Sequence, residues 1–537
     1  MISRFGYVRV GAAVPAVRAA AVEENVSSMI ELAHQAAEQR CDIAVFPELC
    51  STGYTCADLF QQKTLLQAAL RGLDRFRGAT VGSPCVFVVG LPLSNRNQLF
   101  NCAVAVQAGA VLGIVPKTYI PGHKEYYEPR WFASADSAAD PFLDIDGSPV
   151  PFGADLLFQE SSWPAFTFGL EICEDLWAPI PPSSRLALAG ASIILNASAS
   201  DDLAGKDTYR RDLIRQQSAR SLCAYVYAAA GVGESTTDLV FGGHSLIAEN
   251  GIILGETDRF QREPQLTTAD IDVDFLEHER IHNVTYGKAV ARESALASDT
   301  AASGLDGRRV KFKAADVGDT PRLRRTVAAH PFIPAADSQR RERCGEIFAI
   351  QSSGLATRLE HTGIRKVVIG LSGGLDSTLA LLVAREAFTR LGLDPAGIHC
   401  LTMPGFGTSQ RTRQNVTALC EALHTDLSTV DITQSCRRHL SDIGHDGETP
   451  DVTFENAQAR ERTQVLMDKA NLLGALVVGT GDLSELALGW CTYNADHMSM
   501  YAVNCGVPKT LVTFLSQFVA DTWEDEALTA TLREILE

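Results

Sequence analysis

Residues 366–390 place a Ser/Gly turn between an apolar, β-branched run and an apolar-periodic helix. Gly373 and Gly374 lack a Cβ, so the backbone there can bend tightly and approach an anion closely. Ser372 and Ser377 add hydroxyl groups where the unpaired amides of a helix start favour phosphate. Asp376 would repel a bare phosphate, so its carboxylate predicts a bridging Mg²⁺. The segment therefore predicts a phosphate site, against the competing interpretation of an ordinary strand-to-helix turn.

A carboxylate, an ammonium group and a thiol each stand at the end of an apolar run in the first half of the chain. They are Glu48, Lys117 and Cys173. Adjacent strand ends of one sheet would bring the three together, whatever their separation in sequence.

Acyl transfer is the chemistry that such a trio supports. A thiol is nucleophilic only as the thiolate, so Glu48 is predicted to accept the proton of Cys173 as general base. Lys117 supplies fixed positive charge near the oxyanion that forms when sulfur attacks an amide carbon. Ammonia leaves, and water then hydrolyses the thioester. Taken singly, Cys173 would be a small buried hydrophobe, and Glu48 and Lys117 would be solvated loop residues.

Composition narrows the class of protein. The 537 residues exceed one typical core and predict at least two domains. A net charge of −18 argues against a nucleic-acid or anionic-membrane binder. No apolar run approaches a membrane span, and the thirteen cysteines show no Cys-x-x-Cys spacing, so a reduced, cytoplasmic protein is expected.

Strand and helix patterns alternate along both halves of the chain. Residues 1–275 are predicted to form one domain, the charged and Ala/Ser-rich residues 276–335 a linker, and residues 336–537 a second domain. The second domain is predicted to be a doubly wound parallel sheet, with ligands beyond the carboxyl ends of its strands. Its predicted elements are helices 340–359, 378–391 and 410–423 and strands 366–370, 397–402 and 428–432.

The first half resembles the nitrilase (carbon–nitrogen hydrolase) family over about residues 9–274. Its Glu-Lys-Cys triad matches Glu48, Lys117 and Cys173, and a further glutamate of the family matches Glu128. The resemblance implies an α-β-β-α sandwich. It also implies that glutamine is held by His123, Ser200 and Lys206. The related glutaminases usually carry Tyr and Arg at the first and third of these positions, and losing the fork of Arg would weaken the grip on the substrate carboxylate.

The second half is similar to the synthetase domain of NAD synthetases, from about residue 331 to 509, with an adenine nucleotide alpha hydrolase-like fold. The resemblance implies that ATP is bound by Gly370, Leu371, Ser372, Gly373, Gly374, Leu375, Asp376, Ser377 and Thr480. It implies Mg²⁺ at Asp376 and Glu485. It also implies that the pyridine substrate, deamido-NAD, is bound by Asn456, Glu485, Trp490, Cys491, Thr492 and Tyr493. Packing in a core is the commoner fate of residues such as Trp490 and Tyr493.

The pairing of the two halves is more specific than either half. Residue 2 is Ile rather than the Cys of one class of ammonia-supplying domain, and the Gly-x-Cys-x-Gly elbow of another is missing. The pairing resembles glutamine-dependent NAD synthetases, which implies glutamine, ATP and deamido-NAD as substrates and a homo-oligomer, an octamer in the family. Further sequence follows in those enzymes where this chain ends at Glu537, so a truncated product or a partner that supplies the rest is expected.

Two other functions remain open at this point. One is a stand-alone glutaminase or amidase with an incomplete synthetase domain. The other is a nucleotide-sensing module that binds ATP without turnover.

Overall fold

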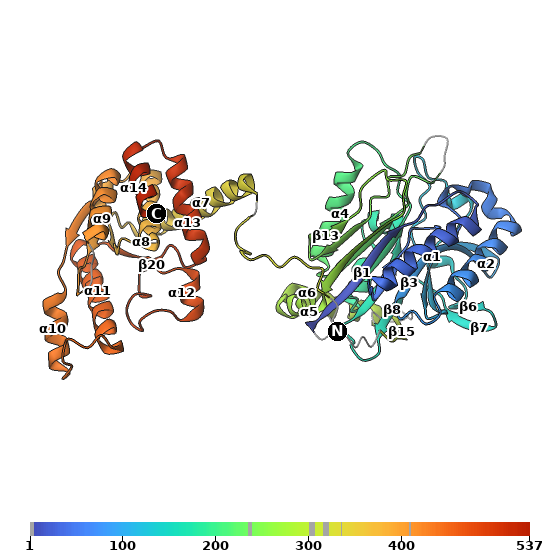
Figure 1. Cartoon of the computed structure of the whole chain (residues 1–537), viewed down its shortest axis with the longest axis horizontal. Helices are drawn as coiled ribbons and strands as arrows, with labels where there is room; N and C mark the ends of the chain where they lie inside the picture. The colour runs from blue at the N-terminus through green and yellow to red at the C-terminus, as the bar shows by residue number, and fades with distance from the viewer. Residues whose placement is uncertain are drawn as a thin grey trace. The chain divides into compact units, whose positions relative to one another are not determined.

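The computed structural model describes residues 5–234, 239–299, 307–314, 322–334, 336–406 and 410–536. The chain divides into two compact units, Met1–Thr326 and Val327–Glu537, which are described separately (Figure 1). Within the described residues, no helix combines the length and the apolar character needed to cross a bilayer.

Two mixed sheets make up the first unit. One has the strand order β14 (Gln265–Asp272), β1 (Tyr7–Val14), β2 (Ile43–Val45), β3 (Val86–Asn95), β4 (Gln98–Gln107) and β5 (Ala110–Pro116). The other has the order β13 (Ile252–Glu256), β12 (Leu246–Glu249), β11 (Ala224–Ala229), β10 (Ile193–Ser198), β9 (Thr167–Ile172), β8 (Leu156–Glu160) and β15 (Arg308–Phe312). A small hairpin, β6 (Phe142–Ile145) and β7 (Ser148–Pro151), forms a separate two-stranded sheet that packs on the cluster of the first sheet.

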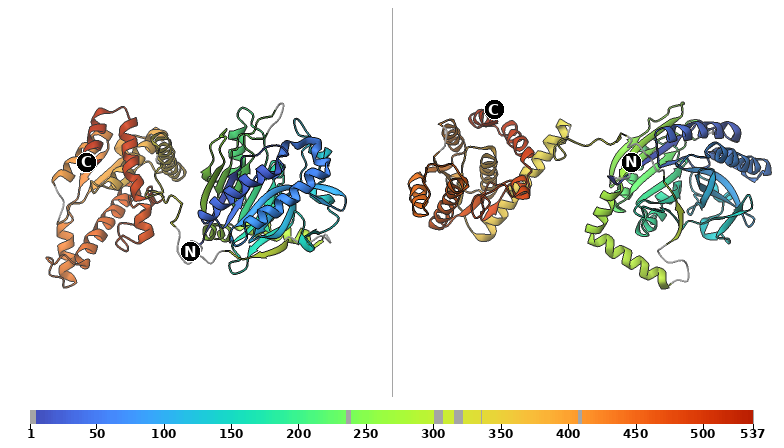
Figure 2. Two further views of the ribbon diagram at one scale, coloured as in Figure 1. Left: turned by 45° about the vertical axis from the view of Figure 1, so that its right-hand side comes forward. Right: turned by 60° about the horizontal axis from the view of Figure 1, so that its bottom comes forward.

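Apolar side chains on both faces of each sheet explain the layered architecture. One buried cluster combines residues such as Val10 and Val88 of the first sheet with Leu170 and Val226 of the second, so the sheets pack face to face. The outer face of the first sheet packs on α1 (Val22–Glu38) and α2 (Lys63–Ala79). Figure 2 shows these two blue helices outside the strands. Helices α3 (Pro182–Leu188) and α4 (Lys206–Arg220) contact the second sheet. The α-β-β-α sandwich is as predicted.

The three reactive residues follow strands, as predicted. The strands were predicted to belong to one sheet, but they belong to two. Glu48 and Lys117 follow β2 and β5 of the first sheet, whereas Cys173 follows β9 of the second. The prediction was wrong on this point because alternating apolar runs reveal strands but not the sheet that each strand joins. Face-to-face packing of the two sheets brings the strand ends together instead.

The predicted linker 276–335 is largely part of the first unit. It contains most of α5 (Val273–His282), then α6 (Val284–Asp299) and strand β15, which pairs in parallel with β8 and buries Phe312 against Phe166. The backbone amide of Arg324 donates to Asp270 at 2.6 Å, which attaches the following segment to β14. The apolar content of this segment is low because β15 is an edge strand with a half-exposed pattern.

A five-stranded, wholly parallel sheet forms the centre of the second unit. Its order is β18 (Asp426–Thr429), β17 (Ile398–Thr402), β16 (Val367–Gly370), β19 (Leu476–Gly479) and β20 (Tyr501–Ala502). Its helices are α7 (Asp337–Thr362), α8 (Leu375–Leu391), α9 (Gln410–Leu423), α10 (Thr433–Asp442), α11 (Val452–Leu473), α12 (Leu483–Leu488), α13 (Lys509–Thr522) and α14 (Glu526–Leu536).

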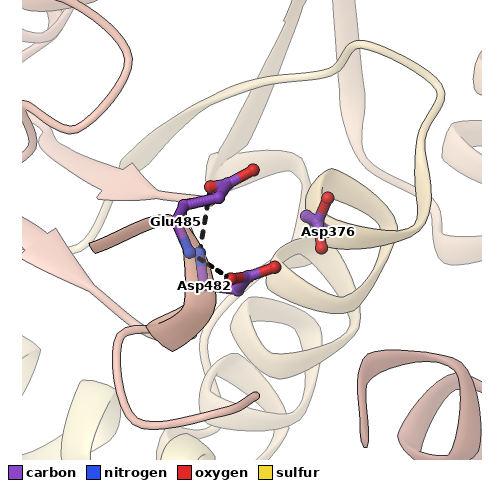
Figure 3. Close-up of side chains that lie close together, drawn as sticks. All are labelled: Asp376, Asp482 and Glu485. Carbon is purple, nitrogen blue, oxygen red and sulfur yellow. Dashed lines mark hydrogen bonds between the residues drawn. The ribbon is translucent and has the colours of Figure 1, made fainter. Parts of the chain in front are cut away.

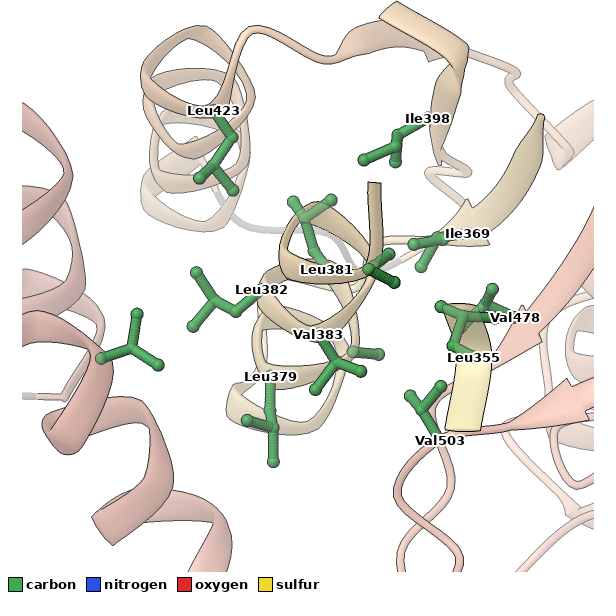
Figure 4. Close-up of a cluster of buried hydrophobic side chains, with 14 of the residues drawn as sticks. Leu355, Ile369, Leu379, Leu381, Leu382, Val383, Ile398, Leu423, Val478 and Val503 are labelled. Atoms are coloured by element: carbon green, nitrogen blue, oxygen red, sulfur yellow. The ribbon is translucent and has the colours of Figure 1, made fainter. Parts of the chain in front are cut away.

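Successive residues of β16 pack in different hydrophobic clusters, one on each face of the sheet. This is the pattern of a strand that is buried on both faces. Val367 and Ile369 pack with α7, α8, α9, α13 and α14, and Figure 4 shows the residues of α8 at the centre of this cluster. Val368 packs on the other face with residues of α10 and α11. The sheet is thus doubly wound, as predicted.

The strand order reverses between β16 and β19, which is where such sheets bind ligands. Most predicted element boundaries lie within three residues of those observed. Helix α8 begins at Leu375 rather than at 378, because Gly374 serves as its N-cap. Asp376 therefore lies in the first turn of α8.

Candidate active sites

Lys117 lies between two carboxylates in the first unit. Its Nζ donates to Glu48 Oε1 and to Glu128 Oε1, each at 2.6 Å, and the Lys117 side chain is fully buried. Burial alone would lower the pKa of Lys117, but the charges of Glu128 and Glu48 outweigh it and hold the pKa well above its usual value. The side chain is therefore a fixed cation.

Both glutamates have further donors. The amide of Asn101 donates to Glu48 Oε1 at 2.6 Å, and the backbone N–H of Ala199 donates to Glu48 Oε2 at 2.9 Å. The hydroxyl of Tyr54 donates to Glu128 Oε1 at 2.9 Å. Burial raises the pKa of Glu128 to about 7, with Lys117 opposing the shift and Glu48 adding to it. The Asn101 amide also lies 3.5 Å from Glu128 Oε2, so it bridges the two carboxylates.

Cys173 occupies a sharp turn between β9 and the short 3₁₀ helix Cys173–Trp177. Its φ of 45° lies in the left-handed region, a strained conformation for a residue with a Cβ. Its backbone N–H donates to Asn196 Oδ1 at 3.1 Å. Burial raises the pKa of its thiol, the charge of Glu48 adds to this, and the charge of Lys117 opposes it. The thiol therefore lies within electrostatic reach of both predicted partners and needs a base to ionise.

The three residues predicted to hold glutamine lie in the loops that follow β5 and β10 and at the start of α4. Ser200 follows β10 and is buried, and Lys206 begins α4. The Nζ of Lys206 contacts Asp201 Oδ1 and donates to the Tyr126 hydroxyl at 3.3 Å. His123 is exposed, with its ring centroid 6.3 Å from that of Tyr126.

Sequence reasoning missed Tyr54 and Asn101. Both are single polar residues far in sequence from the glutamates that they contact, and no local spacing marks them. The nearest signal is the isolated Asn101 within the apolar strand β4, where an uncharged polar residue must find a partner.

The predicted phosphate loop of the second unit is a compact turn held together by hydrogen bonds among its own residues. Gly373 has a φ of +82°, which a residue with a Cβ adopts only with strain. The Ser372 and Ser377 hydroxyls lie 3.2 Å apart, and the N–H of Gly374 donates to Ser372 Oγ at 3.2 Å. Asn504 Nδ2 donates to the carbonyls of Asp376 and Thr480, at 2.9 and 3.1 Å. This amide ties the loop to the end of β19, across the point where the strand order reverses.

Three carboxylates converge beside the loop. Oxygen atoms of Asp376, Asp482 and Glu485 lie within 4.8 Å of one another (Figure 3). Asp482 is the N-cap of α12, and it accepts from the N–H of Glu485 at 2.9 Å. Asp376 and Glu485 were predicted, whereas Asp482 was missed although it stands three residues before Glu485, as in a capping box.

The residues present fit Mg²⁺. Asp376 Oδ1 and Asp482 Oδ2 are buried and accept no hydrogen bond from any described residue, and carboxylate oxygens are the ligands that Mg²⁺ prefers. Burial raises the pKa of Glu485, and the charges of Asp482 and Asp376 add to this. The Nζ of Lys509 contacts Asp376 and lies 3.4 Å from Asp482 and 3.9 Å from Glu485. One ammonium group therefore offsets part of the negative charge of the cluster.

The predicted pyridine-binding residues lie on α11, on α12 and in the loop that follows α12. The Thr492 hydroxyl donates to Asn456 Oδ1 at 2.8 Å, which joins the loop to α11. The side chains of Trp490 and Tyr493 are 79% and 75% exposed, so they do not pack in a core. Cys491 is half-buried. Glu485 belongs to the carboxylate cluster rather than to this loop.

Comparisons with known proteins match both units. A carbon-nitrogen hydrolase family model matches residues 9–280, and a NAD synthase model matches residues 348–521. A glutamine-dependent NAD(+) synthetase from Mycobacterium tuberculosis is 42% identical over 99% of this chain and 78% of its own length. One from Thermotoga maritima is 29% identical over 91% of this chain and 76% of its own. The solved structure of one from Acinetobacter baumannii, in complex with ADP, covers 98% of this chain and 84% of its own, with 23% identity and a TM-score of 0.41.

The match to the mycobacterial relative runs through both units. The matches therefore support the two-domain enzyme and support neither the stand-alone amidase nor the nucleotide-sensing module. The chain belongs to the family of glutamine-dependent NAD(+) synthetases.

Proposed function

We propose that the chain makes NAD⁺ from deamido-NAD, with ATP as the activating substrate and glutamine as the nitrogen source. The observation that carries the proposal is the presence of two separately built sites in one chain. One is the buried Glu48–Lys117–Glu128 cluster beside Cys173, and the other is the phosphate loop with its carboxylates.

At the first site, Glu48 accepts the proton of Cys173, and the thiolate attacks the side-chain amide carbon of glutamine. A base is required because burial disfavours the free thiolate. Lys117 is held by the two glutamates and stabilises the oxyanion of the tetrahedral intermediate. Ammonia leaves with the proton returned by Glu48, and water hydrolyses the thioester to glutamate.

At the second site, the carboxylate of deamido-NAD attacks the α-phosphate of ATP. This gives an acyl adenylate and pyrophosphate, because a free carboxylate resists attack by ammonia. The phosphates bind at the loop of Gly370–Ser377 and the first turn of α8, where helix-start amides favour an anion. When bound at Asp376, Asp482 and Glu485, Mg²⁺ offsets the charge of the pyrophosphate. Ammonia then attacks the acyl carbon, and AMP leaves.

The proposal extends to the pyridine substrate and to assembly. Asn456, Cys491 and Thr492 line one side of the deamido-NAD site, and the exposed rings of Trp490 and Tyr493 stack on the substrate. We also propose that the chain acts as a homo-oligomer, which light scattering of the purified protein tests.

The deciding experiment incubates the protein with deamido-NAD, ATP, Mg²⁺ and either glutamine or ammonium chloride, and measures NAD⁺ and AMP. The wild type is expected to use both nitrogen sources. Cys173→Ala is expected to use ammonium alone, and Asp376→Ala neither. A Cys173→Ala protein that still uses glutamine would contradict the triad, and a wild type that forms no AMP with either source would contradict the synthetase reaction.

A further inference from the structure

The segment between β10 and α4 carries an ion pair that the triad does not use. The side chain of Lys206 contacts Asp201 Oδ1, and the hydroxyl of Tyr126 donates to the same oxygen at 2.7 Å. Asp201 is only 1% exposed, so this carboxylate is held inside the protein. Burial raises its pKa, but the hydrogen bonds from Lys206 and Tyr126 outweigh burial and lower the pKa, which keeps the group anionic.

The second oxygen of this carboxylate, Asp201 Oδ2, is buried and has no hydrogen-bond donor in the described part of the chain. A buried anionic oxygen without a donor is costly, and native proteins rarely leave one so. The side chain of the neighbouring Glu125 also acts to lower the pKa of Asp201. A positively charged donor is the partner that this position lacks.

The ion pair lies next to the reacting thiol. Asp201 directly follows Ser200, and the thiol of Cys173 acts electrostatically on the Tyr126 hydroxyl. The Nζ of Lys206 lies 5.6 Å from the ring centroid of Trp177, at the end of the 3₁₀ helix that Cys173 begins. A substrate with its amide carbon at Cys173 therefore has its other end within reach of Lys206 and Asp201.

The other end of glutamine is a zwitterion, with an ammonium and a carboxylate group on one carbon. Lys206 has three N–H donors and uses two of them on Asp201 and Tyr126. The third can donate to a carboxylate while Asp201 Oδ2 accepts from an ammonium group. An adjacent pair of opposite charges on the protein is thus complementary to an adjacent pair on the substrate.

We propose that Asp201 determines the substrate specificity of the glutaminase site, by accepting a hydrogen bond from the α-ammonium group of L-glutamine while Lys206 donates to the α-carboxylate. The inference rests on the proposed function. It assigns Asp201 a role that the sequence did not indicate. It also explains how a lysine serves at a position where related glutaminases usually carry arginine.

A purely structural role for Asp201, in which it only positions Lys206, makes a different prediction. Two substrate analogues separate the roles, because each lacks one charged group. Glutaramate (5-amino-5-oxopentanoate) has the carboxylate but no ammonium group, and 4-aminobutanamide has the amine but no carboxylate. Loss of the ammonium contact affects glutamine but not glutaramate, whereas a misplaced Lys206 affects both.

The experiment measures kcat/KM for ammonia release from all three amides, in the full-length protein with ATP and deamido-NAD present. In Asp201→Asn, kcat/KM for glutamine is expected to fall roughly 10- to 100-fold and that for glutaramate by less than about threefold. In Lys206→Met, the preference for glutamine over 4-aminobutanamide is expected to shrink instead. The control is Asp207→Asn, the next residue of α4, which is one-third exposed, pairs with Arg259, and is expected to match the wild type.

Each outcome bears on a separate statement. Equal losses for glutamine and glutaramate in Asp201→Asn would overturn the inference and leave the proposed function intact. A wild type that prefers glutamine over glutaramate by less than about threefold would also overturn the inference and leave the proposed function intact. This measurement uses the wild type alone, so it does not depend on whether a variant folds. A wild type that releases no ammonia from glutamine would overturn the proposed function and the inference together. Synthesis of NAD⁺ from ammonium chloride by Asp201→Asn shows that the variant is folded.

Discussion

Asp175 accepts a hydrogen bond at 2.7 Å from the backbone N–H of Tyr119, two residues after Lys117. The same carboxylate accepts from Thr118 N–H at 3.1 Å and, through its other oxygen, from Ile172 N–H at 2.9 Å. One buried side chain therefore fixes the loop that carries the cation against the turn that carries the nucleophile. The two loops come from different sheets, so their spacing depends on this link.

Asp175→Asn is expected to lower glutaminase activity and to destabilise the first unit. Burial raises the pKa of Asp175 to about 8, so a neutral side chain is tolerated there. An asparagine amide, however, presents N–H₂ to one of the backbone N–H groups and cannot accept on both sides. The expected cost is about 1–3 kcal/mol of unfolding free energy and a lower kcat with glutamine. Urea unfolding and ammonia release measure the two effects.

The matched control is Asp212→Asn, an exposed position on α4. An Asp175→Asn protein with the stability and kcat of this control would show that the link does not position Lys117.

The stability of the first unit is expected to depend on pH through Glu128. Burial raises its pKa to about 7 in the folded protein, so between pH 4.5 and 7 the folded state holds more protons than the unfolded chain. The stabilisation is complete below about pH 4.5 and is lost as the pH rises through 7. Glu128→Gln removes this dependence. The melting temperature of wild type relative to Glu128→Gln should therefore be higher at pH 5 than at pH 7.5.

Calorimetry of both proteins at the two pH values checks this expectation. Glu263→Gln, at an exposed position, should keep the pH dependence of the wild type. If Glu128→Gln kept it as well, another group would be responsible for the titration.

Much of the fold could be predicted because buried parallel strands are continuous apolar runs and because turn residues follow them. The run before Gly370 and the glycines after it predicted β16, the loop and α8 within three residues. The strand ends that carry Glu48, Lys117 and Cys173 were predicted for the same reason.

The sheet that each strand joins and several partners of the site residues could not be predicted, because they depend on contacts that leave no local pattern in the sequence. Nothing in the sequence around Cys173 shows that β9 joins a different sheet from β2 and β5. Asn101 and Lys509 each meet their carboxylate partners across more than 20 residues of sequence, and a single polar residue has no periodicity to reveal it. Strand β15 was taken for a linker because an edge strand needs few apolar residues.

Lys509 is expected to compete with a divalent cation for the carboxylate cluster. Its ammonium group contacts Asp376 and lies within 4 Å of the other two carboxylates, so it offsets part of the negative charge that attracts the metal. In the nucleotide-free protein, Lys509→Met should bind Mn²⁺ more tightly than the wild type, on the order of tenfold. Asp482→Asn should bind it more weakly, because one ligand is lost. Titration calorimetry with MnCl₂ measures both.

Lys366→Met, an exposed lysine just before β16, is the control and should match the wild type. Weaker binding by Lys509→Met would show that the lysine supports the metal instead of competing with it. No binding in any variant would contradict a cation site formed by these three carboxylates alone.

Trp490 is expected to bind the substrate without stabilising the fold. The Trp490 side chain is 79% exposed, and the same exposed fraction is found for Leu488, two residues earlier at the end of α12. Stacking of a base on an aromatic side chain is worth about 1–3 kcal/mol, so Trp490→Ala should raise KM for deamido-NAD roughly tenfold. Leu488→Ala should leave KM unchanged, because an aliphatic side chain offers no ring to stack on. Neither variant should shift the melting temperature by more than about a degree, since neither side chain packs in a core.

Steady-state kinetics with ammonium chloride as the nitrogen source measures KM at the second site without a contribution from glutamine hydrolysis. Equal KM values in the two variants would show that Trp490 does not touch the substrate.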